Sequence, residues 1–266
     1  MFNNVNDFKG AFSILYNSTC NWKISALINA SAGSHIGSGT PLITERYRDR
    51  SPNGGPLIRK NPMKLQPLRT VPKGSYIALS GGVDSISIAH HLNSANKLKA
   101  ALWFNHGDDA SASEYQVVHD FCRTNSINLY IGDSSMVDVK HSTSKEKYWS
   151  DQRNAWFNSF DADVVTGHNL DDAVEYYLMT SFQGEGHYTN YRNKNVTRAY
   201  LTTHKSDLVE YAKEYNLKWF EDPTNADCDF TYRNRIRHNI LPEVLLINPG
   251  LYSTVKKRII ERTSDK

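Results

Sequence analysis

A short run of small polar residues separates an apolar segment from an amphipathic one. It consists of Ser80, Gly81, Gly82, Val83, Asp84 and Ser85. Glycines let the backbone approach an anion closely, and the amides at the start of a following helix direct positive charge toward it. Ser80 and Ser85 add hydroxyl donors, and Asp84 is suited to hold Mg²⁺ or to orient the turn. The lysine of a Walker A loop is absent, so the run predicts a phosphate-binding loop of another kind; a plain Gly-Gly turn is the alternative.

A second polar group lies at Gly167, His168, Asp172 and Glu175. Asp172 and Glu175 are three residues apart on an expected helix that begins near Leu170, so both carboxylates share one face. Such a pair can hold Mg²⁺, receive an ammonium group or take a proton from an attacking amine. His168 is expected at the carboxyl end of the preceding strand. The alternative is an ordinary acidic helix start that complements the helix dipole.

Basic residues flank these two groups. Arg233 and Arg237 are four residues apart on an expected helix, so they share a face, and with Asn234 they can contact phosphate or cap a loop.

Alternating segments are expected to position these side chains. Strands are predicted at residues 76–79, 100–104, 128–131 and 163–166, and helices after residue 85, around residues 117–121, at 145–160 and at 171–181. Alternation of strands and helices predicts an α/β fold with a mostly parallel sheet and ligands at the carboxyl ends of the strands.

Four blocks in sequence order resemble a known family. Residues 80–85 match the S-G-G-x-D-S signature of the PP-loop ATP pyrophosphatase superfamily. The triplet Asn105-His106-Gly107, the block 167–175 and a last block made of residues 221–227 and 233–237 are similar to those of tRNA(Ile)-lysidine synthetases. Arg153 and Arg198 also occupy places where this family has arginines. An arginine there could neutralise phosphate charge, and a surface ion pair is an equally good interpretation of each. The resemblance covers roughly residues 75–250, and several ordered blocks are more specific than one.

This resemblance implies a doubly wound sheet with helices on both faces, of the adenine nucleotide alpha hydrolase-like kind. It implies that ATP adenylates a wobble cytidine of tRNA, the isoleucine tRNA with a CAU anticodon, and that lysine then displaces AMP to form lysidine. The resemblance also implies roles for individual residues. The catalytic residues would be Asp84, His168, Asp172 and Glu175, and Mg²⁺ would be bound by Asp84 and Asp172. ATP would be bound by residues 80–85, Asn105, His106 and Gly167. Contacts with RNA or phosphate would come from Arg153, Arg198, Arg233, Asn234 and Arg237. Two alternatives remain open: a PP-loop enzyme that adenylates another acceptor, and a non-catalytic nucleotide-binding protein.

Bulk properties limit the remaining choices. A chain of 266 residues suits one catalytic domain with an appendage. Apolar runs are too short for a membrane span and the N-terminus does not resemble a secretory signal, so a cytoplasmic protein is expected. Cys20, Cys122 and Cys228 are too few and too far apart for a disulfide framework or a Cys-x-x-Cys pair, and structural thiols are preferred.

The chain is expected to divide into a basic extension and linker (1–72), a PP-loop domain (73–250) and a C-terminal tail (251–266). Residues 1–70 hold nine Lys or Arg against three Asp or Glu, which suits contact with nucleic acid, although a solvated extension explains the charge equally well. The sequence leaves a homodimer open.

Overall fold

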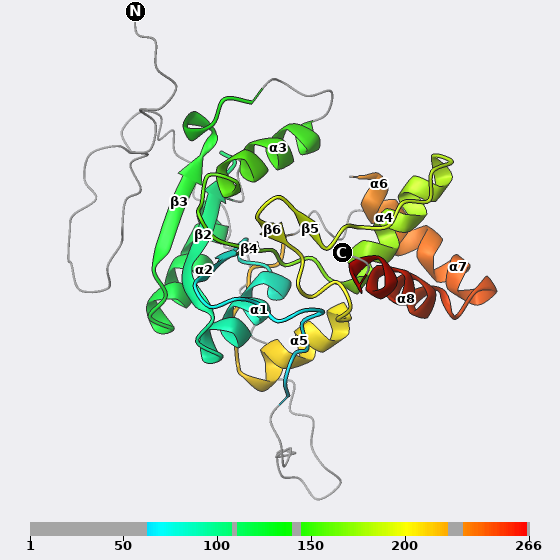
Figure 1. Cartoon of the computed structure of the whole chain (residues 1–266), viewed down its shortest axis with the longest axis horizontal. Coiled ribbons are helices and arrows are strands. Elements are labelled where there is room, and N and C mark those ends of the chain that lie inside the picture. Colours follow the sequence, from blue (N-terminus) through cyan, green and yellow to red (C-terminus); the bar gives the residue numbers. More distant parts are fainter. Residues whose placement is uncertain (1–62, 108–110, 140–144, 223–230, 265–266) are drawn as a thin grey trace, which may run out of the picture.

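The core of the protein is one mostly parallel β-sheet. A computed structural model describes residues 63–107, 111–139, 145–222 and 231–264, and Figure 1 shows the sheet with its helices. The strands are β1 (Ser75–Ala78), β2 (Leu98–Asn105), β3 (Leu129–Asp133), β4 (Val164–Val165), β5 (Arg192–Asn193) and β6 (Val196–Thr197). Their order across the sheet is β3-β2-β1-β4-β6-β5, and only β5 among them runs antiparallel to its neighbour.

Helices follow the strands in sequence. They are α1 (Val83–Ser94), α2 (Ser111–Thr124), η1 (Ser134–Met136), α3 (Lys145–Phe157), α4 (Leu170–Phe182), α5 (Lys205–Glu214), α6 (Tyr232–Arg235), the π-helical turn η3 (Ile236–Ile240), α7 (Leu241–Ile247) and α8 (Leu251–Ser264). The four expected strands and four expected helices are present within a few residues. The hairpin β5–β6 and the helix α5 were not predicted.

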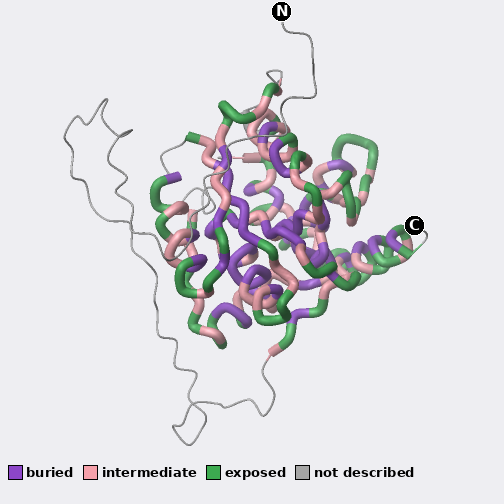
Figure 2. Tube along the Cα trace, turned by 60° about the vertical axis from the view of Figure 1, so that its left-hand side comes forward, coloured by how far each residue is buried: buried purple, intermediate pink, exposed green. Residues whose placement is uncertain are grey.

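The two faces of the sheet carry different helices, because alternate residues of a strand point to opposite sides. On β2, Ala101 and Trp103 pack in one core with residues of α1 and α2. Ala100, Leu102 and Phe104 pack on the other face with α3 residues. Figure 2 shows buried residues concentrated along this central layer. The expected doubly wound arrangement, with helices on both faces, is therefore confirmed.

The direction of chain progression reverses beside β1. The chain passes from β1 outward to β2 and β3, and then returns to β4 on the other side of β1. Loops that leave the carboxyl ends of β1 and β4 therefore diverge, and such a switch point is where doubly wound sheets bind ligands. The 80–85 loop follows β1, and Gly167 and His168 follow β4.

A separate helical layer lies beside the β4–β6 side of the sheet (Figure 1). Its core includes Leu170 and Val174 of α4, and Val255 and Ile259 of α8, all almost completely buried. The tail expected from residue 251 is instead the helix α8, because an apolar residue at nearly every fourth position gives it a face that packs against α4.

The segment directly before β1 also packs on the domain. Leu65 and Val71 are buried in the sheet core, and the backbone amide of Leu68 donates to the carbonyl of Ala199 at 2.7 Å. Residues 63–72, expected as linker, thus contribute to the folded unit. The basic extension at residues 1–62 lies outside the described residues.

The predicted helix 145–160 ends at Phe157. The side-chain amide of Asn195, next to β6, donates to the carbonyls of Phe157 and Phe160 at 2.7 and 3.1 Å. These carbonyls at the helix end lack partners within the helix, so a long-range contact that the local sequence does not reveal satisfies them.

Candidate active site

Hydrogen bonds within the 80–85 loop stabilise its conformation. The Ser85 hydroxyl donates to the carbonyl of Gly82 at 3.0 Å and accepts from the Ser80 amide at 3.2 Å. Gly81 has a φ of +79°, a conformation that residues with a side chain rarely adopt. Gly82 caps α1 with extended backbone and no side-chain hydrogen bond, so no side chain covers the helix start there. The helix start predicted after the glycines is therefore present, and amides at such a start can bind an anion.

Two distant segments hold this loop in place. The Phe220 amide donates to the Gly81 carbonyl at 2.8 Å. A Cβ on Gly167 would lie 3.2 Å from the Ser85 backbone nitrogen, so the loop after β4 passes almost directly against the start of α1. The loops that follow β1 and β4 therefore form one packed unit.

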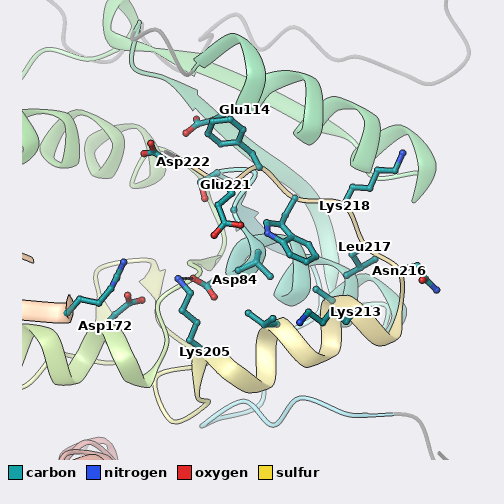
Figure 3. A pocket seen from close by; sticks show the side chains of 18 of the residues that line it. Asp84, Glu114, Asp172, Lys205, Lys213, Asn216, Leu217, Lys218, Glu221 and Asp222 are labelled. Atoms are coloured by element: carbon teal, nitrogen blue, oxygen red, sulfur yellow. Dashed lines mark ion pairs between the residues drawn. The ribbon is translucent and has the colours of Figure 1, made fainter. Parts of the chain in front are cut away.

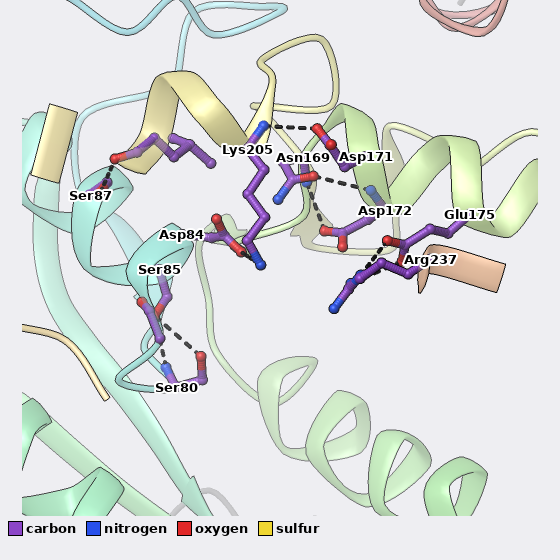
Figure 4. Close-up of polar contacts among 12 residues, drawn as sticks. Ser80, Asp84, Ser85, Ser87, Asn169, Asp171, Asp172, Glu175, Lys205 and Arg237 are labelled. Carbon is purple, nitrogen blue, oxygen red and sulfur yellow. Dashed lines mark hydrogen bonds and ion pairs between the residues drawn. The ribbon is translucent and has the colours of Figure 1, made fainter. Parts of the chain in front are cut away.

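Asp84 is the acidic residue of the 80–85 loop, and the pKa of its carboxyl is shifted. Burial, opposed by the nearby Lys205 ammonium, raises the pKa of its carboxyl to about 6. Lys205 Nζ lies 3.9 Å from Asp84 Oδ2 (Figures 3 and 4). The other oxygen, Oδ1, is buried and makes no hydrogen bond with any described residue.

Two cavities meet at the loop. The smaller, about 250 Å³, lies between the ends of β1, β2 and β4 and includes Leu102, Phe104, His106, Phe157 and His168 in its lining. The larger, about 930 Å³, extends along α5 to residues 216–222 (Figure 3). Ser80, Gly82, Asp84, Glu114, Asp172 and Arg233 line both. A ligand that spans both cavities would therefore pass the loop and Asp84.

The expected carboxylate pair is present on one face of α4, but its oxygens already have partners. Glu175 is 2% exposed and accepts from Arg237 Nε at 2.7 Å and from Arg233 Nε at 2.6 Å. Asp172 accepts from Arg233 Nη2 and, in a capping box with Asn169, from the Asn169 amide at 3.0 Å. Figure 4 shows the Glu175–Arg237 pair. The helix-cap interpretation of Asp172 thus holds alongside its place in both cavity linings.

Arg233 and Arg237 do share a face, as predicted, across α6 and the π-helical turn. π-Helical turns are rare and occur often at functional sites. Here the shared face is directed at the α4 carboxylates. Asn234 is buried, and its backbone amide donates to the hydroxyl of Thr231, the residue that caps α6.

His168 lines the smaller cavity and is electrically neutral. Burial, reinforced by the charges of Arg198, Arg233 and Arg153, holds the pKa of its imidazole well below the usual value. Its Nδ1 lies 2.8 Å from the Thr166 hydroxyl, which fixes the ring. A neutral imidazole can accept or donate a hydrogen bond but brings no positive charge.

The remaining predicted residues divide between the cavities and the framework. Arg153 and His106 line the smaller cavity. Arg198 donates to the Asn190 carbonyl at 3.0 Å and lines neither cavity. The Asn105 side chain accepts from the Gly107 amide at 2.8 Å, and so shapes the turn after β2. Of the block 221–227, only Glu221 and Asp222 are described, and both line the larger cavity.

Lys205 and Asp171 were missed by the sequence analysis. Asp171 stands within the 167–175 block, so its position was visible, but its contact with α5 was not. Lys205 lies in a segment where no helix had been predicted, and no local pattern connects it to a loop 120 residues earlier.

The residues around the 80–85 loop fit a Mg²⁺ ion that is bound together with phosphate. A buried carboxylate oxygen without a partner, beside a loop shaped for phosphate, is the kind of ligand that Mg²⁺ combines with substrate phosphates and water. Asp84 Oδ1 meets this description. Among the described residues, no cluster of three or more His, Cys, Asp or Glu forms a metal site of protein ligands alone. These residues therefore fit a Mg²⁺ ion held by Asp84 together with a bound phosphate. They do not fit an ion at Asp172 with protein ligands alone.

The fold and site together define an α/β protein of the doubly wound class, with a glycine-rich phosphate-type loop at the switch point of its sheet. Residues 60–244 match the PP-loop domain, and the chain belongs to this family. The expectation drawn from the S-G-G-x-D-S signature is confirmed.

Curated relatives agree with the further motif blocks. The chain is 29% identical over 196 residues to a tRNA(Ile)-lysidine synthase of Legionella pneumophila. The matched region covers 68% of this chain and 44% of that protein. It is 31% identical to the tRNA(Ile)-lysidine synthase of Persephonella marina, over 66% of this chain and 42% of that one. The chain thus spans less than half the length of these two relatives.

A solved structure supports the fold. The U34-tRNA thiolase NcsA from Methanococcus maripaludis aligns with 73% of this chain and 74% of its own, with a TM-score of 0.57 and 19% identity. Among the described residues, no helix is long and apolar enough to cross a membrane.

Proposed function

We propose that this protein uses ATP to adenylate a wobble cytidine of isoleucine tRNA and then joins lysine to that base. The observation that carries the ATP part is the meeting of the 80–85 loop, the α1 amides and the unpartnered Asp84 Oδ1 at one switch point. The tRNA and lysine parts are supported by the names of the curated relatives and by the four motif blocks.

The adenosine of ATP suits the smaller cavity. Its lining combines apolar side chains from β2 and α3 with the polar edges of His106 and His168. The phosphates would then lie on the loop amides, and Asp84 would hold a Mg²⁺ ion that neutralises phosphate charge. Arg153, in the same cavity, supplies a further cation.

Two displacement steps follow. The cytidine O2 forms a bond to the α-phosphorus while the bond to the β-phosphate oxygen breaks, and pyrophosphate leaves. The lysine ε-amine then forms a bond to C2, the bond between C2 and the adenylate oxygen breaks, and AMP leaves. The loop amides stabilise the negative charge that develops in the first step.

The amine must lose a proton in the second step. Asp172 is the group proposed to accept it, because its carboxylate lines both cavities and pairs with one guanidinium group, whereas Glu175 is enclosed by two. Glu175 then serves to hold Arg233 and Arg237 in position. The neutral His168 is suited to hydrogen bonding with the base or the nucleotide.

Mass spectrometry of tRNA nucleosides tests this function. The full chain is incubated with ATP, Mg²⁺, lysine and isoleucine tRNA, with Asp84→Ala as the control. Lysidine that forms only with the parent protein is the expected result. AMP release without lysidine would favour another acceptor, and absence of pyrophosphate release with every acceptor would favour a non-catalytic nucleotide-binding protein.

The basic extension is proposed to contact tRNA. Because residues 63–72 pack on the domain, deletion should stop at residue 62. The shortened protein should bind tRNA more weakly and with a smaller dependence on salt, since fewer counterions are released. Unchanged affinity and salt dependence in a filter-binding assay would refute this contact.

A further inference from the structure

The 80–85 loop has no lysine, yet the fold brings one to it. Lys205 is the first residue of α5, and its side chain lines the larger cavity together with Ser80, Gly82 and Asp84. Its Nζ lies 3.9 Å from Asp84 Oδ2. Figure 4 shows the lysine side chain extending from α5 toward the start of α1.

The backbone of Lys205 is fixed from the opposite side. Its amide donates to Asp171 Oδ2 at 2.8 Å, and the Tyr252 hydroxyl of α8 donates to Asp171 Oδ1 at 3.0 Å. The Ser87 hydroxyl of α1 also donates to the Leu208 carbonyl of α5 at 2.9 Å. The backbone at Lys205 is therefore held in place by contacts with α1 and α4, while the ammonium group of its side chain faces the cavity.

The ammonium group retains capacity for another anion. A separation of 3.9 Å is an ion pair without a close hydrogen bond, and the Lys205 side chain is 41% exposed. Four other cations line the same cavity. Arg233 and Arg237 both donate to Glu175. Lys213 lies in the last turn of α5 and Lys218 follows that helix, so both are at the opposite end of α5 from Lys205. Arg153 lines the smaller cavity instead.

We propose that Lys205 binds the β- and γ-phosphates of ATP and then the departing pyrophosphate. It thereby supplies from α5 the charge that a Walker lysine supplies from within its own loop. With Mg²⁺ and phosphate bound, Asp84 would hold the metal, and the Lys205 ammonium would be left to pair with the terminal phosphates. This role rests on the ATP binding proposed above.

Binding of three ligands separates this role from a structural one. Affinities for Mg²⁺-ATP, pyrophosphate and AMP are measured by calorimetry for the parent protein, Lys205→Met and Lys205→Arg. Lys205→Met should bind ATP and pyrophosphate about 10- to 100-fold more weakly and AMP about equally, because AMP lacks the phosphates that the lysine contacts. Lys205→Arg should retain much of the affinity, since it keeps the charge.

The matched control is Lys257→Met. Lys257 forms an ion pair of the same 3.9 Å length with Glu261, but on the exposed face of α8. The Lys257→Met substitution should leave the affinities for Mg²⁺-ATP, pyrophosphate and AMP unchanged. Equal weakening of AMP and ATP in Lys205→Met, or no weakening of ATP and pyrophosphate, would overturn the proposal. Failure of the parent itself to bind ATP and pyrophosphate would instead contradict the proposed function.

Discussion

The buried Asp84 carboxyl destabilises the ligand-free fold when it is charged. Its pKa of about 6 lies above the 3.8 of an ordinary aspartate, because burial disfavours its charge. The folded protein therefore holds this proton more tightly than the unfolded chain does. Stability from this group is full below pH 4, declines as pH rises from about 4 to 6, and stays reduced above pH 6.

Asp84→Asn should make the ligand-free protein more stable at pH 8 by up to about 3 kcal/mol, because the amide carries no charge to desolvate. The gain should shrink as pH falls toward 4, and binding of Mg²⁺-ATP should be lost. Urea denaturation at pH 5 and 8 measures the difference. A parent protein more stable than the variant at pH 8 would contradict the assigned origin of the pKa shift.

Glu175 is a buried charge whose partners depend on it. Glu175→Gln leaves two guanidinium groups beside a neutral amide, which should lower the free energy of unfolding by about 3–5 kcal/mol. Thermal or urea denaturation measures this change in the free energy of unfolding. The control is Glu185→Gln, since Glu185 is 56% exposed on its side chain and pairs only with the exposed His187 among the described residues. Equal stability of the two variants would show that the Glu175 cluster contributes little.

At the scale of elements, the site depends on how closely the loops after β1 and β4 approach. Gly167→Ala places a methyl group 3.2 Å from the Ser85 backbone nitrogen, so the start of α1 must shift by a few tenths of an ångström. Overpacking of this kind costs about 1–3 kcal/mol, and ATP affinity should fall because the loop amides move.

Calorimetric titration of ATP checks this expectation. Gly250→Ala is the control, because its added methyl group meets only Asn248 Oδ1 at an ordinary 3.5 Å. An ATP affinity of Gly167→Ala equal to that of the control would mean that the two loops tolerate separation.

At the scale of the whole molecule, α8 helps to build the helical layer by packing against α4. Val255 is fully buried in the core shared by α4 and α8. Val255→Asp would bury an unpaired carboxylate, so we expect a loss of more than about 3 kcal/mol, visible as a large fall in melting temperature. Thr254→Asp, on the exposed side of the same helix, should melt close to the parent. Similar melting of both variants would indicate that α8 is only loosely attached.

The sequence by itself determined the alternation of strands and helices, the 80–85 loop at a strand-to-helix turn, and the shared face of Asp172 and Glu175. These features are local, because periodicity, glycine placement and helix spacing are recorded in neighbouring residues. Their element bounds were correct within a few residues, and the early end of α3 coincides with a contact from the distant Asn195. The assigned roles of individual site residues stay predictions.

Only the tertiary structure decided which side chains meet. It paired Arg233 and Arg237 with Glu175, joined α8 to α4, and brought Lys205 to Asp84 across 120 residues of chain. Such contacts depend on where the chain returns after each crossover, and a single sequence carries no local signal for that return. The loop was therefore evident from the residues, whereas the lysine that completes its charge was evident only from the fold.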